Sequence, residues 1–369
     1  MTSTPGRRPT AREVAAEVGV STKTVSNAYN RPDQLSADLR EQILATAARL
    51  GYPGPDPVAS GLRRGRVGAI GVAYANRLSY AFDDPVTREL LGGMTSAAES
   101  AGVGLLLLPG SSDPERRTRA ISQALVDGLL ASSLADDDPL LQTAIARRLP
   151  LVVVDQPRPA QLGAGIPWIG VDDRPAAAGA ADHLLDLGHE QFGVVCFGLW
   201  RGPTRGLVGP EAQQRATYAV SRDRLAGYRD AIERRGLDWD LVPVFQGTDS
   251  TPDEGEAGAT AALACIPRPT ALLCMSDRLA EGALRTAIRL GLRVPEDLSV
   301  LGFDDAVPTA ATLDLTTVQQ PQRRKGELAA QALLALLDGS SPAAPYEPLP
   351  TRLIVRGSTG PVPPMDSSA

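Results

Sequence analysis

Short polar side chains and one cation stand together near the N-terminus, at the start of the second predicted helix. They are Ser21, Thr22, Lys23 and Ser26. The N-terminus of a helix carries free backbone N–H groups and the positive end of the helix dipole. Such a helix end suits a phosphate or a base edge in the major groove of DNA. On residue types alone, a small helical cap with solvated polar side chains remains the alternative.

A second set of candidate residues follows the ends of predicted strands in the longer C-terminal part of the chain. Residues 170–173, 275–280 and 302–305 each place a carboxylate after a strand or at a helix start. Ligands of α/β folds bind where strand carboxyl ends and helix N-termini meet. Carboxylates and an arginine fork suit the vicinal hydroxyls of polyols or sugars. Asp172 and Asp277 have an equally good alternative as helix N-caps.

Several other chemistries lack the residues they need. The three cysteines form no CxxC pair and are odd in number, so neither a disulfide framework nor a zinc cluster is supported. The two histidines, His183 and His189, fall on a helix and its end, where we expect structural roles. No GxGxxG follows the first strand and no GxxxxGK[ST] loop occurs. We expect no cofactor and no metal, and keep a sugar-active α/β enzyme with a helical cap as the alternative function.

Three short helices are predicted to position the N-terminal set, over residues 11–18, 22–30 and 37–50. Ala15 is small where two helices cross, and Gly19 permits the tight turn between them. This spacing is typical of a helix-turn-helix motif. Residues 52–57 hold three prolines, which cannot continue a helix and predict a stiff linker.

From residue 65 the pattern changes to strands that alternate with helix-length segments. Strands are predicted over residues 67–73, 105–108, 128–131, 151–155, 168–171, 193–197, 242–245, 271–275 and 298–303. The alternation indicates a parallel α/β fold, and the strand number favours two doubly wound sheets over one. The aperiodic residues 199–220 are predicted to be an inserted or mobile loop at a crossover. Residues 360–369 are predicted to be a disordered tail.

Charge is distributed unevenly along the 369 residues, whose net charge is −6. Residues 1–65 carry nine basic and six acidic side chains, a net of +3, so only this end is suited to a polyanion. We find no signal peptide and no apolar run long enough to cross a membrane. We therefore expect a cytoplasmic protein with no membrane partner.

Residues 9–26, the run Leu50-Gly51-Tyr52-Pro53 and the later motifs closely resemble the lactose/galactose repressor family of bacterial transcription regulators. The similarity spans residues 9 to about 357. It implies an N-terminal all-α helix-turn-helix domain over residues 1–52 and a prolyl linker with a hinge helix over residues 53–65. A two-lobed effector domain, like periplasmic sugar-binding proteins, is expected over residues 66–359. Its three crossovers are expected near residues 165–171, 304–306 and 339–347.

The resemblance also assigns DNA-contacting roles. Thr22 and Lys23 occupy positions that read operator bases. The expected phosphate-binding residues are Ser21, Thr24, Ser26 and Ser36. Asn27 stands where many members carry a base-reading arginine, so either operator preference shifts there or Asn27 contacts only phosphate. Leu62 matches a leucine that wedges into the central base step of the minor groove, with Arg63 near the phosphates. A plain linker is the alternative for this segment.

For the effector, the resemblance favours Arg224 and Asp304, with Ser276 next. The remaining expected contacts are Tyr80, Phe82, Asp84, Asp172 and Asp277. Because one helix-turn-helix reads few base pairs, we expect a homodimer on a palindromic double-stranded operator. The predicted function is that of a repressor controlled by a sugar-like or related molecule between the lobes. No residue encodes whether that molecule releases or promotes DNA binding.

Overall fold

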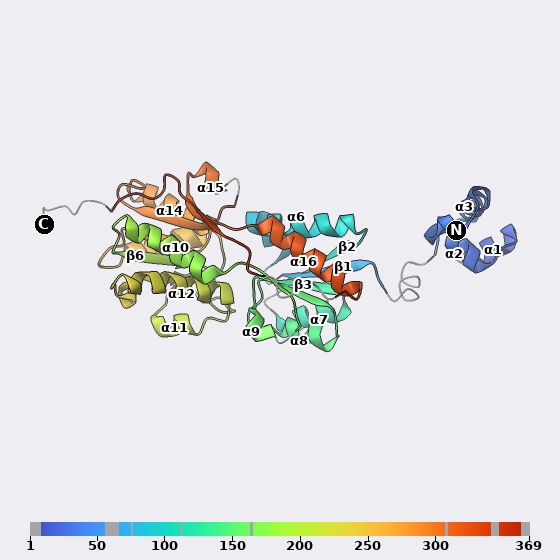
Figure 1. Cartoon of the computed structure of the whole chain (residues 1–369), viewed down its shortest axis with the longest axis horizontal. Coiled ribbons are helices and arrows are strands. Elements are labelled where there is room, and N and C mark those ends of the chain that lie inside the picture. Colours follow the sequence, from blue (N-terminus) through green and yellow to red (C-terminus); the bar gives the residue numbers. More distant parts are fainter. Residues whose placement is uncertain are drawn as a thin grey trace, which may run out of the picture. The chain divides into compact units, whose positions relative to one another are not determined.

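The computed structural model describes residues 9–55, 66–74, 77–110, 113–162, 165–306, 309–340 and 347–362. The chain divides into two compact units, Met1–Gly68 and Ala69–Ala369, called the helical unit and the two-lobed unit below (Figure 1). Each unit has its own buried core. In the described residues no helix is both long and apolar enough to span a bilayer.

The helical unit contains the three predicted helices with the predicted bounds. They are α1 (Ala11–Val18), α2 (Thr22–Asn30) and α3 (Ala37–Leu50), with a 3-10 turn at Pro32–Gln34. Gly19 ends α1 at a φ of 78°, and the N–H of Val20 donates to the carbonyl of Ala15. Ala15, Val25 and Ile43 are buried between the helices. The tight turn therefore requires the glycine, and the small and branched apolar residues set the angle of α2.

The packing of the helical unit continues into the predicted linker. The ring of Tyr52 meets the edge of Tyr29 at a centroid distance of 6.1 Å, and Gly54 is buried beside Tyr29. A Cβ at Gly54 would lie 3.2 Å from Cε1 of Tyr29. Gly54 thus packs on the helices, two residues beyond the domain end predicted at residue 52, while Pro53 is exposed. Leu62 and Arg63 lie outside the described residues.

The two-lobed unit contains two sheets, and the helices around each sheet form one lobe (Figure 1). The first sheet is parallel, in the order β2-β1-β3-β4-β5. Its strands are β1 (Ala69–Tyr74), β2 (Gly104–Leu108), β3 (Gly128–Ser132), β4 (Leu151–Val154) and β5 (Trp168–Ile169). The second sheet has the order β12-β11-β10-β9-β6-β8-β7, with antiparallel strands only at its two edges.

All nine predicted strands are found. Those of the second sheet are β6 (Phe192–Cys196), β8 (Val244–Gln246), β9 (Ala271–Cys274) and β10 (Ser299–Asp304). Three short strands were not predicted, namely β7 (Gly206–Leu207), β11 (Thr316–Gln319) and β12 (Arg352–Ile354). The α/β class with two doubly wound, mainly parallel sheets is confirmed.

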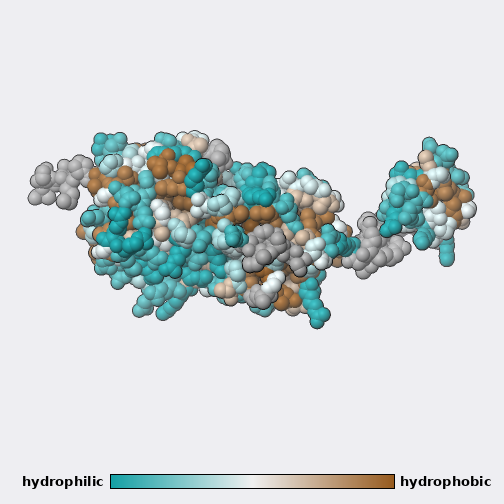
Figure 2. Space-filling view, viewed as in Figure 1, coloured by the Kyte–Doolittle hydropathy of each residue, from teal (hydrophilic) through white to brown (hydrophobic). Residues whose placement is uncertain are grey.

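Helices cover both faces of each sheet. In the first lobe α6 (Pro85–Ser100) and α16 (Gln322–Leu337) pack on one face, and α7 (Pro114–Gln123) and α8 (Pro139–Ala146) on the other. The second lobe has the helices α10 (Asp173–Asp186), α12 (Ala219–Arg234), α13 (Pro252–Leu263) and α14 (Asp277–Arg289). Short helices are α5 (Leu78–Asp83), α9 (Pro159–Leu162), α11 (Pro210–Gln214) and α15 (Thr309–Thr312), with a 3-10 turn at Trp239–Leu241. The visible surface is mostly hydrophilic, with smaller hydrophobic patches (Figure 2).

The second crossover lies later in the chain than predicted. After β10 the chain turns at Asp304 and Asp305, both with positive φ, and returns through α15 as β11, parallel to β10. It leaves for the first lobe between β11 and α16, through residues 319–322. The prediction of a crossover at residues 304–306 is therefore wrong, because the Asp-Asp pair ends a strand without ending the lobe.

Two segments predicted to be irregular make defined contacts. Within residues 199–220, β7 pairs with β8, and the N–H groups of Thr217 and Tyr218 donate to the carbonyl of buried Leu199. This segment extends the edge of the second sheet and does not lie at a crossover. At the other end, the N–H of Val362 donates to the carbonyl of Leu187, and the carbonyl of Gly360 lies 3.0 Å from Nε2 of His189. Residues 360–362 thus pack on the second lobe and do not belong to a disordered tail.

Candidate DNA-binding helix and effector cleft

The N-terminus of α2 presents the predicted DNA-reading residues. Ser21 caps the helix by accepting a 3.0 Å hydrogen bond from the N–H of Thr24, and the two hydroxyls lie 2.8 Å apart. Thr22 and Lys23 follow on the first turn, and both side chains are exposed. The cap sets where the helix begins, and so fixes which side chains the first turn displays.

The other predicted DNA contacts also lie on this face or at the next helix start. Ser36 caps α3 by accepting from the N–H of Leu39 at 3.4 Å. Ser26 Oγ lies 3.3 Å from Nδ2 of Asn30. Asn27 Nδ2 donates to Oε1 of Gln34 at 3.2 Å, which leaves its amide oxygen and second hydrogen available. A capping serine uses its oxygen as an acceptor, so the cap itself does not consume the hydroxyl proton. One proton of the Ser21 and Thr24 hydroxyls lies between those two oxygens, and the other can be donated to a phosphate.

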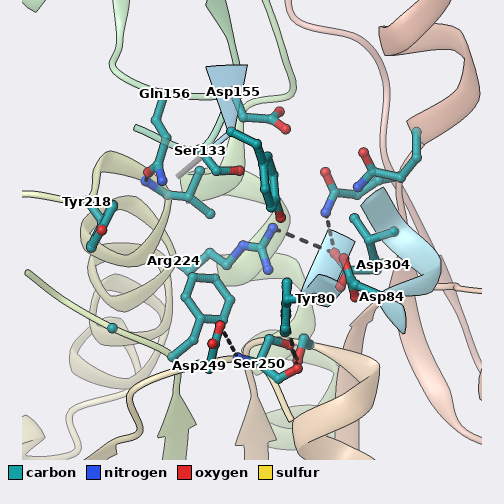
Figure 3. Close-up of a pocket in the computed structure, with 18 of the residues that line it drawn as sticks. Tyr80, Asp84, Ser133, Asp155, Gln156, Tyr218, Arg224, Asp249, Ser250 and Asp304 are labelled. Atoms are coloured by element: carbon teal, nitrogen blue, oxygen red, sulfur yellow. Dashed lines mark hydrogen bonds and ion pairs between the residues drawn. The ribbon is translucent and has the colours of Figure 1, made fainter. Parts of the chain in front are cut away.

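A cavity of about 160 Å³ lies between the two lobes (Figure 3). First-lobe residues come from the segments after β1, β3 and β4, and include Ser133 and Asp155. Second-lobe residues come from the segments after β6, β8 and β9, from the end of β10 and from α12. The carboxyl ends of both parallel sheets therefore face the same cavity, as expected for a ligand site in this class of fold.

Five of the eight predicted effector contacts line this cavity. They are Tyr80, Asp84, Arg224, Ser276 and Asp304. Phe82 does not, since it is 57% exposed and stands two residues from Tyr80 on α5, which places it on another face of the helix. Asp172 is exposed at the N-terminus of α10 and lies outside the cavity.

Asp277 has a different role from the one predicted. Its carboxylate is buried and accepts a 2.6 Å hydrogen bond from the hydroxyl of Thr317 and a 2.7 Å hydrogen bond from the N–H of Ala306. It therefore ties α14 to β11 and to the turn after β10. Burial raises the pKa of Asp277 to about 7. Its neighbour Ser276 lines the cavity and caps α14 by accepting from the N–H of Leu279.

Arg224 is held rigidly at the wall of the cavity. Nε donates to Oδ1 of Asp173 at 2.8 Å, and Nη1 donates to the carbonyl of Met275. The guanidinium carbon lies 3.6 Å from the centre of the Phe303 ring. Nη2 lies 3.9 Å from Oδ1 of Asp304, and Figure 3 shows the guanidinium directed toward that carboxylate. Since its geometry is set before any ligand arrives, Arg224 offers a pre-organised donor.

The carboxylates of the cavity are acceptors in a poorly hydrated place. Asp84 caps α6 by accepting from the N–H of Thr87 at 2.9 Å and from its hydroxyl at 2.6 Å. Burial raises the pKa of Asp84 above its ordinary value and the pKa of Asp304 well above it. The aromatic rings of Tyr74 and Tyr80 add flat apolar surface. Such a mixture suits a compact ligand with hydroxyl donors and one apolar face.

Direct contacts hold the two lobes together around the cavity. The hydroxyl of Tyr80 donates to the carbonyl of Ser250 at 3.0 Å, and the N–H of Val220 donates to Oε1 of Gln156 at 2.8 Å. Nη1 of Arg222 lies 2.7 Å from Oδ2 of Asp136 across the same interface. The lobes are therefore closed on one another in this structure.

Several cavity residues were missed by sequence reasoning. They are Val86, Ser133, Asp155, Gln156, Phe197, Gly198, Tyr218, Val220, Thr248, Asp249, Ser250, Gln320 and Gln322. Many directly follow β3, β4, β6 and β8, so the strand-end rule applied to every strand would have found them. Gln320 and Gln322 lie at the crossover that was placed wrongly, and no local pattern distinguishes them.

Comparison with known families agrees with both units. The model described as "Bacterial regulatory proteins, lacI family" matches residues 10–54. A periplasmic-binding-protein-like domain model matches residues 181–359. The first match covers all three helices of the helical unit, and the second covers most of the second lobe and α16.

Curated relatives extend the similarity over the whole chain. The HTH-type transcriptional regulator Rv3575c of Mycobacterium tuberculosis is 42% identical over 363 residues, covering 98% of this chain and 99% of the relative. The HTH-type transcriptional regulator IpsA of Corynebacterium glutamicum is 40% identical over 331 residues, covering 89% and 91%.

Solved structures show the same fold. A lacI-family regulator from Corynebacterium glutamicum is 35% identical with a TM-score of 0.73, covering 97% of this chain and 100% of the other. A Lac repressor dimer bound to operator and the anti-inducer ONPF is 27% identical with a TM-score of 0.75, covering 96% and 100%. A complex of the regulator CelR with cellobiose is 28% identical with a TM-score of 0.66, covering 95% and 100%.

The helix-turn-helix unit and the cleft between two α/β lobes together define a ligand-responsive transcription regulator. The chain belongs to the lacI family of bacterial regulatory proteins. It is a DNA-binding regulator, and the alternative of a sugar-active enzyme has no support among these relatives.

Proposed function

We propose that the protein is a repressor whose operator affinity is controlled by a small, hydroxyl-rich molecule bound between the lobes. The observation that carries this proposal is the cavity itself, in which Arg224 of one lobe and Asp84 of the other face a volume of about 160 Å³. Charged groups that are buried and already oriented bind hydroxyls with little further ordering.

The effector class follows from the donors and acceptors of the cavity. Arg224 donates, Asp84 and Asp304 accept, and Tyr80 offers a ring face. Among related structures, CelR is in complex with cellobiose and Lac repressor is in complex with ONPF or ONPG. We therefore infer a sugar, a polyol or a related compound whose ring can lie against Tyr80.

DNA binding is assigned to the exposed first turn of α2. Thr22 and Lys23 contact base edges, and Ser21, Thr24, Ser26, Asn27 and Ser36 contact phosphates or flanking bases. Leu62 wedges between central base pairs and Arg63 contacts the backbone nearby; this assignment rests on the sequence resemblance alone. The positive net charge of residues 1–65 supports the assignment of DNA binding to this end of the chain, because DNA phosphates attract it.

We propose that the regulator acts as a homodimer on a palindromic operator, since one α2 helix reads only a few base pairs. A related Lac repressor structure is a dimer on its operator. On the first lobe, Leu106 and Leu125 are large apolar side chains with 39% and 63% exposure, and support an interface there. Analytical ultracentrifugation with and without operator tests the dimer, and a monomer on a single half-site would contradict it.

Selection of bound duplexes from a random pool tests DNA binding, and a panel of sugars, polyols and nucleosides added to the selected duplex tests control. We expect a palindrome and at least one compound that changes its affinity. Sequence-independent binding in every condition would overturn the proposal.

A further inference from the structure

The chain contains only two lysines beside 35 arginines, and one of them is fully buried. Lys325 lies on α16 in the first lobe, with 0% of its surface exposed. A buried ammonium group is costly unless it is paired and hydrogen-bonded. Its partners therefore show what this lysine does.

Lys325 connects the two lobes through the cavity. Nζ donates to Oδ1 of Asp155 at 2.7 Å and to Oε1 of Gln320 at 2.6 Å. Nε2 of Gln320 in turn donates to Oδ1 of Asp304 at 2.6 Å. Asp155 follows β4 of the first lobe and Asp304 ends β10 of the second, and both line the cavity (Figure 3).

The hydrogen-bonded chain Asp155–Lys325–Gln320–Asp304, called the relay below, engages one oxygen of each carboxylate. Within the described part of the chain, Oδ2 of Asp155 and Oδ2 of Asp304 accept no hydrogen bond. Each lobe thus contributes one fixed acceptor whose second oxygen remains available to a hydroxyl donor. A ligand that fills both acceptors bridges the two lobes.

The relay also reaches a rigid pair of helices in the first lobe. A Cβ on Gly326, next to Lys325, would lie 2.0 Å from the carbonyl of Leu90 on α6, and a Cβ on Gly93 would lie 2.0 Å from the carbonyl of Arg323 on α16. The backbones of α6 and α16 are therefore in direct contact and must move together. Both helices begin at the cavity, since Asp84 caps α6 and Gln322 is the first residue of α16.

We propose that Lys325 is a positioning residue that holds Asp155 and Asp304 as a pair of ligand acceptors and couples ligand binding to the α6–α16 helix pair. This inference rests on the proposed function. It goes beyond it by naming a residue that does not line the cavity and yet sets both affinity and response.

The test compares Lys325→Met with Leu333→Ala in the full-length protein. Methionine keeps the length of the side chain without its donors. Leu333 is fully buried on the same helix, in the core of the first lobe, so its truncation controls for loss of stability. The probe is the member of a panel of D-glucose, D-galactose, sorbitol, cellobiose and adenosine that most raises the melting temperature of the unsubstituted protein. Calorimetry gives its Kd, and operator affinity with and without it gives the response.

We expect Lys325→Met to raise the probe's Kd about tenfold to a hundredfold, which is the range for loss of hydrogen bonds to charged groups. The probe's effect on operator affinity should also be reduced. Leu333→Ala should lower the melting temperature and leave the probe's Kd within twofold. A probe Kd and response in Lys325→Met within twofold of the unsubstituted protein would overturn the proposal, as would equal loss in both variants.

Gln320→Met breaks the relay one step closer to Asp304 and leaves Lys325 paired with Asp155, so it decides the matter if Lys325→Met does not fold. Because Gln320 itself lines the cavity, the deciding quantity is the effect of saturating probe on operator affinity: a reduced effect in this variant supports the relay, and an unchanged effect overturns it. If the unsubstituted protein binds operator but no panel member changes that affinity, the proposed effector class is wrong. That outcome differs from failure of the present inference, in which the probe acts on the unsubstituted protein and acts equally on Lys325→Met.

Discussion

The helical unit and the effector cleft are built in opposite ways. On α2 the candidate DNA contacts lie within residues 21–27, and their side-chain hydrogen bonds among the described residues span at most seven positions. In the cleft, Tyr80 bonds Ser250 and Lys325 bonds Asp155, each pair 170 positions apart in sequence. The first site is an exposed surface on a local element, and the second exists only when two lobes meet.

This difference separates binding from stability in one region and links them in the other. Thr22 and Lys23 project into solvent, so their removal leaves the core of the helical unit intact. The buried groups that face the ligand, such as Arg224 and Asp304, also hold strand ends and helices in place. Substitutions in the two regions should therefore differ in how they affect folding.

The largest expected effect is that of Arg224→Ala. Its removal leaves Oδ1 of Asp173 and the carbonyl of Met275 without their donor in a buried place, while Arg158 still donates to Oδ2 of Asp173 at 2.6 Å. Breaking a buried ion pair costs about 3–5 kcal/mol of folding free energy. We expect the effector Kd to rise by more than roughly 100-fold while operator binding without effector persists. Calorimetry, thermal unfolding and gel shift measure the three quantities.

Arg229→Ala is the matched control for Arg224, because Arg229 lies on the same helix outside the cavity. It should change none of the three quantities substantially. An effector Kd within threefold of the unsubstituted value in Arg224→Ala would show that the cleft does not depend on its arginine.

The next largest effect is expected for Lys23→Ala and Thr22→Ala. Loss of a base contact costs about 1–3 kcal/mol of binding free energy, or roughly 5- to 150-fold in operator affinity. Thermal unfolding and effector affinity should be unchanged, in contrast to Arg224→Ala. Fluorescence anisotropy with the selected duplex measures the loss. Arg49→Ala, on the last turn of α3, removes an equal charge from the same unit and serves as the control.

If Arg49→Ala weakens operator binding as much as Lys23→Ala does, the effect comes from net charge, and the assignment of base reading to Lys23 is wrong.

A smaller effect is expected from pH, and only in the cleft. Because burial raises the pKa of Asp84 and of Asp304, these carboxylates gain protons at a higher pH than exposed aspartates do. A protonated carboxyl accepts ligand hydroxyls less well, so effector affinity should fall as pH falls through these raised pKa values. The fall is at most about tenfold per pH unit for each proton taken up. Calorimetry from pH 7.5 to pH 5 measures it.

Asp84→Asn should bind the effector more weakly at neutral pH, and its effector affinity should depend less steeply on pH. If effector affinity falls with pH as steeply in Asp84→Asn as in the unsubstituted protein, the titrating group is not Asp84.

The same contrast explains what could be predicted from sequence. The bounds of α1, α2 and α3 followed from local signals, since Ser21 and Ser36 cap their own helices and Gly19 and Gly51 end them. The positions of the nine predicted strands also followed from local patterns. The strands β7, β11 and β12 have only two to four residues and depend on neighbouring strands for their pairing, so no local pattern predicted them.

The cleft was predicted only in part, because the strand-end rule names a segment and not the side chain that faces the ligand. Ser276 and Asp277 are adjacent, yet Ser276 lines the cavity while Asp277 bonds Thr317 and Ala306. Asp155 and Gln320 enter the site through Lys325, a contact between residues far apart in sequence. Such contacts are set by the approach of the two lobes, which no local pattern encodes.

The smallest expected effect concerns the contact between the lobes. Arg222 and Asp136 pair at 2.7 Å across the interface and are partly exposed, so their attraction is worth about 1 kcal/mol or less. If closure of the lobes contributes to effector binding, Asp136→Lys should lower effector affinity severalfold, because the new lysine repels Arg222. The double variant Asp136→Arg with Arg222→Asp should recover most of the affinity, and the loss should shrink at high salt because ions screen the pair.

The control is Asp297→Lys, which breaks the exposed Arg293–Asp297 pair within the second lobe and should leave effector affinity unchanged. Equal loss from Asp136→Lys and Asp297→Lys would mean that lobe closure does not contribute to affinity, and that the cleft, like α2, binds through a surface that is already complete.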